Sequence, residues 1–279
     1  MNYPTFPGLY RKLISSIVFN FGLIIVCTAC SPAWLQLQNQ AESQGLTATQ
    51  IPANAFTLAG FYQIKSPGDQ IVHIYLEGDG KPFEQGLMAT NDPTTRASVV
   101  LPLMALDTAS KLYLARPCYN GHALDKICNP SLWTTARYSE TVVLAMAAAI
   151  HSFCVEHGFR KVILIGHSGG GAIAMLVAGH LPETQALITL AGNYDIDAWA
   201  DFHGYDRLSL SLNPAQFPNT GIPEWHYLGD KDSNIPPVLF SQDLLNRANS
   251  HVIVLPDTEH NYGWVKHWPN ILSEIGSIH

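Results

Sequence analysis

Residues 161–172 of the chain read KVILIGHSGGGA, in which an apolar run is followed by a G-x-S-x-G pattern and a series of small residues. The apolar run predicts a buried strand, and the residues after Ser168 predict a helix that stops near Gly179. A strand that turns sharply into a helix is the context in which G-x-S-x-G lifts a serine hydroxyl out of a sheet. We therefore predict that Ser168 is a nucleophile.

The start of this helix also predicts an anion site. The free N–H groups of a first helical turn and the positive end of the helix dipole would point toward the space beside Ser168. The N–H of Gly169 would then meet the oxyanion that forms when the serine attacks an acyl carbon. A turn that binds phosphate is the alternative, but neither a P-loop pattern nor an early G-x-G-x-x-G fingerprint is present.

Short apolar runs alternate with helical patterns along the chain. The expected strands are Phe56–Ile64, Ile71–Leu76, Lys111–Ala115, Lys161–Ile165, Ala186–Leu190, Glu224–Leu228 and His251–Leu255. Two more helices are expected, one over 139–157 that ends at Gly158 and one over 268–275. Apolar strands between helices indicate an α/β fold with a doubly wound, mostly parallel sheet in one domain. The segment between residues 190 and 224 allows at most a small cap.

The composition supports a folded protein and excludes several classes. Hydrophobic residues make up 47% of the chain and charged residues 13%, whereas disorder requires low hydrophobicity with high net charge. A formal charge of −7 leaves no global basic footprint, so nucleic acid is not an expected partner. No H-E-x-x-H pattern and no His/Cys cluster with ligand spacing occurs, so we expect neither a metal nor a cofactor.

Element order over residues 54–279, together with G-x-S-x-G, resembles the α/β-hydrolase superfamily of serine hydrolases. The segments LEGDG (76–80), RPC (116–118) and WTTARY (133–138) further resemble a group of uncharacterised exported bacterial members. The superfamily resemblance implies a triad in the order serine, acid, histidine.

The residues of that triad follow from two later turns. Residues 229–236, GDKDSNIP, resemble the G-x-x-D-x-x-[VI]-P turn of the superfamily, and this match places the acid on Asp232. Asp230 and Asp195 are the alternatives. His260 lies in the loop after the last expected strand, where the resemblance implies the base.

The resemblance also implies a second oxyanion donor in the turn after the strand Ile71–Leu76. The match places it on the backbone N–H of Asp79, although Glu77 stands where the superfamily often has histidine. A carboxylate directed inward would oppose an oxyanion, so we expect the Asp79 side chain to point to solvent or to pair locally. For Arg137 we weigh a structural ion pair, which is favoured, against an anion-binding role.

The first thirty residues have the pattern of an export signal. Arg11 and Lys12 precede an apolar run over 13–26, which is shorter than the about 20 residues that a membrane span needs. The ending TAC resembles a bacterial lipobox, which implies acylation of Cys30, and Ser31 then implies the outer membrane. We expect a signal peptide over 1–29 and a polar tether over 30–53. Secretion without lipid and a permanent anchor helix are the alternatives.

The other cysteines agree with export. Cys118 and Cys128 flank a short polar loop, and an oxidising compartment favours a disulfide between them. A zinc pair is disfavoured because C-x₂-C spacing is absent. Cys154 is expected on the apolar side of a helix, as a small buried residue.

These residues predict a serine hydrolase that acts on an ester or thioester through an acyl-enzyme on Ser168. His260 would take the serine proton and later activate water, while Asp232 would fix the histidine tautomer. An acyltransferase, a peptidase or a catalytically silent binding lipoprotein is the alternative. The expected partners are a small acyl substrate and, through Cys30, the membrane of the cell envelope. Four aromatic residues are candidates for an apolar acyl pocket: Tyr194, Trp199, Tyr262 and Trp264.

Overall fold

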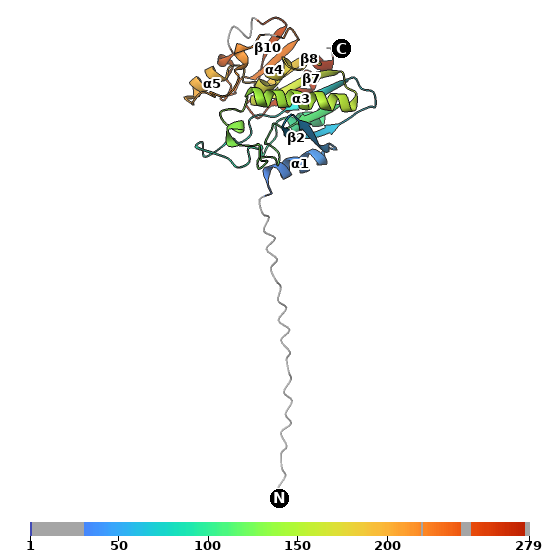
Figure 1. Cartoon of the computed structure of the whole chain (residues 1–279), viewed down its shortest axis with the longest axis vertical. Helices are drawn as coiled ribbons and strands as arrows, with labels where there is room; N and C mark the ends of the chain where they lie inside the picture. The colour runs from blue at the N-terminus through green and yellow to red at the C-terminus, as the bar shows by residue number, and fades with distance from the viewer. Residues whose placement is uncertain (2–30, 219, 241–246, 277–279) are drawn as a thin grey trace. The chain divides into compact units, whose positions relative to one another are not determined.

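The main sheet is mostly parallel, as predicted. The computed structural model describes residue 1 and residues 31–218, 220–240 and 247–276, and its compact unit begins at Pro32. The main sheet of this unit has eight strands in the order β1-β2-β6-β3-β7-β8-β9-β10. Figure 1 labels β2, β7, β8 and β10 of this sheet. In chain order they are β1 (Thr47–Ala53), β2 (Phe56–Gln63), β3 (Ile71–Leu76), β6 (Lys111–Leu114), β7 (Lys161–His167), β8 (Thr184–Leu190), β9 (Glu224–Gly229) and β10 (Ser250–Leu255). β2 is antiparallel to both of its neighbours, and the strands from β6 to β10 are parallel.

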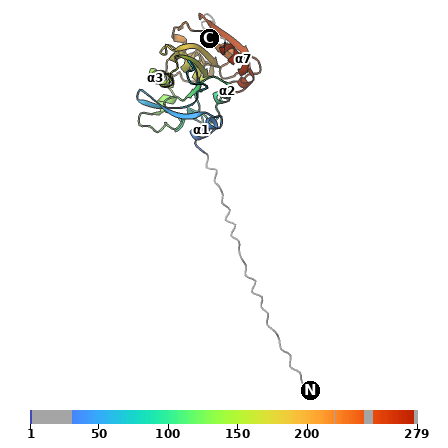
Figure 2. The same ribbon diagram turned by 90° about the vertical axis from the view of Figure 1, so that its right-hand side faces the viewer.

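Helices cover both faces of this sheet. The helices in the described part of the chain are α1 (Ala33–Ser43), α2 (Val100–Leu106), α3 (Glu140–His157), α4 (Gly169–Ala178), α5 (Ile196–His203) and α7 (Trp264–Gly276), of which α5 belongs to the small cap between β8 and β9. The remaining short elements are the hairpin β4 (Phe83–Glu84) and β5 (Met88–Ala89) and the 3₁₀ turns η1 (Pro130–Trp133), η2 (Pro214–Gln216) and η3 (Pro237–Leu239). Figure 2 shows α3 and α7 on opposite sides of the strands. α4 packs with α3, and α2 packs with α7, which makes a three-layer fold.

The central strands place their carboxyl ends together. In the register, Leu76 of β3 pairs with Gly166 of β7, and Gly166 pairs with Thr189 of β8. The residues of these strands are almost all buried, which explains their nearly continuous apolar sequences. Loops that follow neighbouring parallel strands meet at one edge of the sheet, where α/β proteins carry their sites.

The seven expected strands are all present, with ends displaced by two residues or fewer. The helix expected over 139–157 is α3, and Gly158 ends it in the left-handed conformation, with φ +80°. The last helix, α7, begins at Trp264, four residues before the expected start.

The predicted polar tether over 30–53 is wrong for the residues that the structure describes. Residues 33–43 form α1, which buries Leu37 and Ala41 with Ala33 in a narrow stripe. Residues 47–53 form β1, which pairs with β2 along its whole length. Most residues of α1 are exposed or half-buried and most residues of β1 are exposed, so their sequences read as polar although they belong to the fold.

The N-terminal predictions concern a part of the chain that the structure does not describe. Apart from Met1, the signal peptide over 1–29 and the acylated Cys30 lie outside the described residues. Within the described ranges, no helix combines the length and the apolar character that crossing a membrane requires.

Candidate active site

Ser168 occupies the turn between β7 and α4. Its backbone has φ +53° and ψ −122°, a conformation that costs a non-glycine residue about 1–3 kcal/mol. The turn is tight because α4 starts against the end of β3: a Cβ on Gly170 would lie 2.2 Å from the carbonyl oxygen of Leu76. Position 170 therefore requires glycine, and the close packing of α4 maintains the sharp turn that G-x-S-x-G predicts.

Three side chains from separate loops form a continuous line of hydrogen bonds. The Ser168 hydroxyl lies 2.9 Å from Nε2 of His260, and Nδ1 of His260 lies 2.8 Å from Oδ2 of Asp232. Asp232 follows β9 and His260 follows β10, so the parallel sheet brings together residues up to 92 positions apart. A serine, a base in hydrogen-bonding reach and an acid behind the base are what an activated nucleophile needs.

The Asp232 carboxylate is buried and ionised. Its Oδ1 accepts the N–H groups of Asn234 and Ile235, both at 2.8 Å. Burial by itself raises the pKa of Asp232, but the hydrogen bond and charge of His260 and the two N–H groups outweigh it and lower the pKa. The carboxylate therefore stays negative and can hold the Nδ1–H of His260.

The two alternative acids have other partners. Asp230 accepts the N–H of Thr258 at 3.2 Å, which ties the turn after β9 to the loop after β10. Asp195 caps the first turn of α5. Within the described residues, the carboxylate hydrogen-bonded to His260 is that of Asp232.

Two side chains hold the main chain of His260. Nε2 of His167 donates to the His260 carbonyl oxygen at 2.7 Å, and the indole N–H of Trp264 donates to the same oxygen at 2.9 Å. Burial of His167 and its proximity to His260 lower the pKa of His167 to about 3. The His167 ring is therefore neutral near pH 7 and carries its proton on Nε2 for this bond.

Asn234 also contacts His260, although it was not among the site residues predicted from the sequence. Its Oδ1 accepts the indole N–H of Trp199 at 3.3 Å. Because an indole nitrogen can only donate, this contact fixes the orientation of the amide and directs Nδ2 toward Nε2 of His260, 3.0 Å away. Nε2 thus accepts from both Asn234 and Ser168. The signal available in the sequence was the position of Asn234 in the acid turn, two residues after Asp232.

The expected oxyanion donors lie beside Ser168. Gly169 is the first residue of α4, and Asp79 follows Gly78 in the turn after β3. A Cβ on Gly78 would lie 3.4 Å from the Cβ of Ser168, which shows how closely this turn approaches the serine. Among the described residues, no hydrogen bond uses the N–H of Asp79 or of Gly169.

The Asp79 side chain points neither to solvent nor to a partner nearby in the sequence, so this expectation is wrong. Its carboxylate pairs with Arg116 at 2.8 Å and with Arg137 at 2.7 Å, and the Tyr138 hydroxyl lies 2.7 Å from both carboxylate oxygens. Burial raises the pKa of Asp79, but the charges of the two arginines outweigh burial and hold the pKa well below its usual range. Arg137 thus forms the ion pair that the sequence analysis favoured.

Ser168 and His260 line a cavity of about 1040 Å³. Its other walls come from the turn after β3, the β4–β5 hairpin, α5 and the loop before α7. Of the four aromatic residues expected in an acyl pocket, Trp199 and Tyr262 line this cavity. Tyr194 is buried under Arg247 and Trp264 is buried beside His260, so these two belong to the packing instead.

The cysteines are arranged as predicted. Cys118 and Cys128 form a disulfide, and Cys154 is buried in α3 with a free thiol. Burial and the charge of Glu183 raise the pKa of Cys154 to about 12, which leaves it unreactive. Within the described part of the chain, no three His, Cys, Asp or Glu side chains are grouped so that they could hold a metal ion.

Several solved structures share this architecture. An esterase from Pyrococcus furiosus is 14% identical, with a TM-score of 0.60 over 84% of this chain and 89% of its own. A putative lipase from Acinetobacter baumannii is 12% identical, with a TM-score of 0.59 over 88% and 94%. A serine hydrolase without a lid from Xanthomonas campestris is 14% identical, with a TM-score of 0.53 over 84% and 93%.

No protein-family model and no curated protein matches the sequence. The likeness to solved structures therefore rests on the strand order, the helices on both faces and the path of the chain. These features show that the chain has the α/β-hydrolase fold.

Proposed function

We propose that the protein is a serine hydrolase that cleaves a carboxylic ester or thioester through an acyl-enzyme on Ser168. The observation that carries this proposal is the hydrogen-bonded line from Ser168 through His260 to Asp232, which opens on the large cavity. A protein that only binds a ligand has no physical need for a base within 2.9 Å of a strained serine.

The first half-reaction forms the acyl-enzyme. Nε2 of His260 takes the Ser168 proton as the oxygen bonds to the acyl carbon, and the carbonyl oxygen becomes an oxyanion. The N–H groups of Gly169 and Asp79 would donate to that oxyanion. When the tetrahedral species collapses, the bond to the leaving alcohol or thiol breaks, and this group takes the proton from His260.

The second half-reaction returns the enzyme to its starting state. A water molecule gives its proton to His260 and bonds to the acyl carbon, and the bond to Ser168 then breaks as the serine recovers the proton. Asp232 keeps the Nδ1–H of His260 in place and stabilises the imidazolium in both halves. The products are a carboxylic acid and the free enzyme.

The test is covalent labelling of the purified mature protein with a fluorophosphonate, which reacts with activated serines. We expect labelling of the wild type and none of Ser168→Ala or His260→Ala. Ser43→Ala and His251→Ala are matched controls, because both side chains are exposed and lie outside the cavity. A folded wild type that is not labelled, or labelling that persists in Ser168→Ala, would contradict the proposal.

We also propose that the enzyme acts in the cell envelope, held by a lipid on Cys30. The support is the sequence pattern, in which a basic start and an apolar run precede TAC. The test is expression with radiolabelled palmitate followed by fractionation. Label in the membrane fraction that is lost in Cys30→Ala is expected, whereas an unlabelled soluble protein would favour secretion without lipid.

A further inference from the structure

We propose that the Asp79 carboxylate is a positioning group, which fixes the turn after β3 so that the Asp79 N–H is aimed at the oxyanion. This inference rests on the proposed function, because it concerns the same reaction. It assigns a role to the three segments LEGDG, RPC and WTTARY, which the triad leaves unexplained. Asp79, Arg116, Arg137 and Tyr138 come from these segments and are called the Asp79 clamp below.

Both oxygens of the Asp79 carboxylate have partners in the clamp. Oδ1 accepts from Nη1 of Arg116 at 2.8 Å, and Oδ2 accepts from Nη1 of Arg137 at 2.7 Å. The Tyr138 hydroxyl completes the set. A carboxylate with two charged donors and a hydroxyl around it has one geometry open to it, because any rotation breaks a charge-assisted hydrogen bond.

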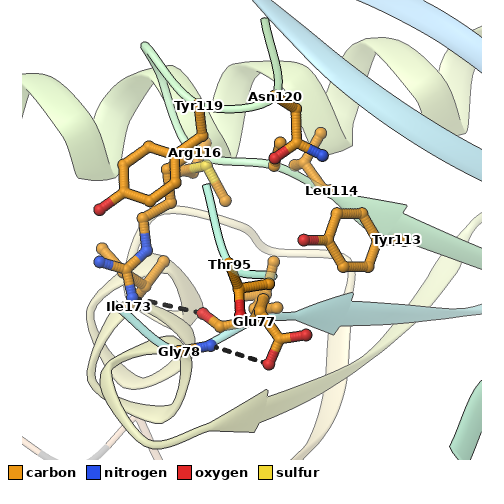
Figure 3. A pocket seen from close by; sticks show the side chains of 12 residues that line it. Glu77, Gly78, Thr95, Tyr113, Leu114, Arg116, Tyr119, Asn120 and Ile173 are labelled. Carbon is orange, nitrogen blue, oxygen red and sulfur yellow. Dashed lines mark hydrogen bonds between the residues drawn. The ribbon is translucent and has the colours of Figure 1, made fainter. Parts of the chain in front are cut away.

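The clamp is anchored to the rest of the fold. Nη2 of Arg116 donates to the carbonyl oxygen of Glu77 at 3.3 Å, as Figure 3 shows, so one guanidinium holds both ends of the turn. Nε of Arg137 donates to the carbonyl oxygen of Thr134 at 2.8 Å. The side chains of Arg116 and Arg137 are 5% and 6% exposed, so neither has room to swing away.

The main chain of Asp79 is held on its other side. The Tyr119 hydroxyl donates to the Asp79 carbonyl oxygen at 3.0 Å. On the preceding side, the Glu77 carboxylate accepts the N–H of Gly78 at 3.2 Å (Figure 3). The same carboxylate also accepts the Ser98 hydroxyl. The carboxylate and the carbonyl of Asp79 are thus both occupied, and its N–H is left for a ligand.

The clamp also removes the electrostatic objection to a carboxylate at this place. A Cβ on Gly169 would lie 1.9 Å from Oδ1 of Asp79, so the carboxylate packs directly against the first residue of α4. An uncompensated negative charge there would oppose an oxyanion bound by the N–H of Gly169. Two guanidinium groups in contact with the carboxylate cancel that charge locally.

The experiment uses the purified mature protein and three variants. Asp79→Asn keeps the backbone N–H and the side-chain size, but an amide cannot accept from both arginines. Arg137→Gln removes one arm of the clamp and leaves the Arg116–Asp79 pair, which protects against loss of folding. Arg137→Lys keeps the positive charge but has a single nitrogen to place against the Asp79 carboxylate. The matched control is Arg247→Gln, which breaks an equally buried ion pair with Glu224 away from the cavity.

Three quantities are measured for each variant: kcat and KM for p-nitrophenyl butyrate, the fluorophosphonate labelling rate, and the Ki of phenylboronic acid. The boronate forms a tetrahedral adduct on the serine and therefore reports on the oxyanion site. Loss of one oxyanion donor lowers kcat by about 100- to 1000-fold. We expect a fall of about 100-fold in Asp79→Asn and a smaller one in Arg137→Gln, partly restored in Arg137→Lys. KM should hold steady while the boronate Ki rises in parallel.

The outcomes separate the two proposals. If the folded wild type is not labelled, the proposed function fails and the positioning role fails with it. If the wild type is labelled but the folded Asp79 and Arg137 variants keep its kcat and boronate Ki, the positioning role alone is overturned. Variants that only melt earlier, as expected of Arg247→Gln, would likewise show that the clamp serves stability and does not position the N–H.

Discussion

Ser168, the proposed nucleophile, has an unfavourable backbone conformation. With φ +53°, it lies in a region that L-residues rarely adopt, and the packing of α4 against β3 keeps it there. The strain and the hydrogen bond to His260 are independent consequences of the same turn. One is a cost in stability, and the other is the arrangement that the proposed chemistry requires.

Substitution of Ser168 can separate the effect of the backbone strain from the effect of the hydroxyl. Ser168→Gly should remove labelling as completely as Ser168→Ala does, because both lack the hydroxyl. Glycine tolerates positive φ, so Ser168→Gly should be relieved of the backbone strain that Ser168→Ala keeps. After the greater chain entropy of glycine is subtracted, the free energy of unfolding of Ser168→Gly should be higher by about 1 kcal/mol, and its urea midpoint should be higher. Urea denaturation of the two variants measures the difference. Without strain, the greater chain entropy of glycine would make Ser168→Gly the less stable of the two, so a lower urea midpoint for Ser168→Gly would show that the turn is not strained.

Asn234 links the cap to the base at the scale of elements. Its backbone carbonyl accepts from His203 at 2.8 Å and its side chain accepts from Trp199, both of which lie on α5. The same side chain donates to Nε2 of His260. The small cap is therefore connected to the triad through one amide.

Replacement of Asn234 should change catalysis more than stability. The Asn234 amide competes with the Ser168 hydroxyl for the lone pair of His260 Nε2 that would take the serine proton. Asn234→Leu should therefore raise the fluorophosphonate labelling rate by about 2- to 10-fold, the equivalent of one neutral hydrogen bond. The measurement is the fluorophosphonate labelling rate, with Asn270→Leu as the surface control, since Asn270 is exposed on α7 and lies outside the cavity. An unchanged labelling rate would mean that the amide has no influence on His260.

The N-terminal elements show why a polar sequence is not always a linker. In α1 the buried stripe recurs every four residues through Leu37, and in β1 Ile51 is buried while alternate residues face solvent. Pro52 is tolerated because β1 is the edge strand of the sheet. These elements cover β2, whose edge would otherwise be open.

Removal of these elements should be costly. A chain that begins at residue 54 loses the burial of Leu37 and Ile51, each worth about 1.5–3 kcal/mol, and exposes the edge of β2. We expect its free energy of unfolding, measured by urea denaturation, to be about 4 kcal/mol lower than that of a chain that begins at Pro32. It should also aggregate more readily. Equal stability would restore the tether interpretation.

For the molecule as a whole, the buried ionisable groups predict acid sensitivity. His167 has a pKa of about 3 in the fold, whereas an unfolded histidine titrates near pH 6.5. The unfolded chain therefore binds a proton that the native chain does not, and stability falls as pH drops below about 6.5. Asp232 and Asp79 also have lowered pKa values. Their contribution to stability is complete above about pH 4 and is lost at still lower pH.

Through His167, the free energy of unfolding should fall by about 1.4 kcal/mol per pH unit, or by about 2 kcal/mol between pH 6.5 and pH 5. Urea denaturation at these two pH values tests this for the wild type and for His167→Gln, whose amide can still donate to the His260 carbonyl. The variant should lose less stability on acidification. The same loss in both proteins would show that other groups, such as the buried His226, govern the dependence.

What could be predicted from the sequence was local or carried by a resemblance. The strands of the central sheet are read from their own apolar runs, and the turn at Ser168 from its neighbours in the chain. Asp232 and His260 were identified because each follows a strand in a recognisable turn. Sequence patterns of this kind work because burial on both faces of a sheet leaves a signal within a few residues.

The partners of Asp79 were decided by tertiary structure. Arg116, Arg137 and Tyr138 lie 37 to 59 residues from Asp79, and nothing near Asp79 in the chain indicates which of them it meets. The same holds for Asn234, whose amide is oriented by Trp199 on the cap. A charged side chain in the interior is stable only where the fold supplies its counter-charges, and their positions depend on how distant loops meet at the edge of the sheet.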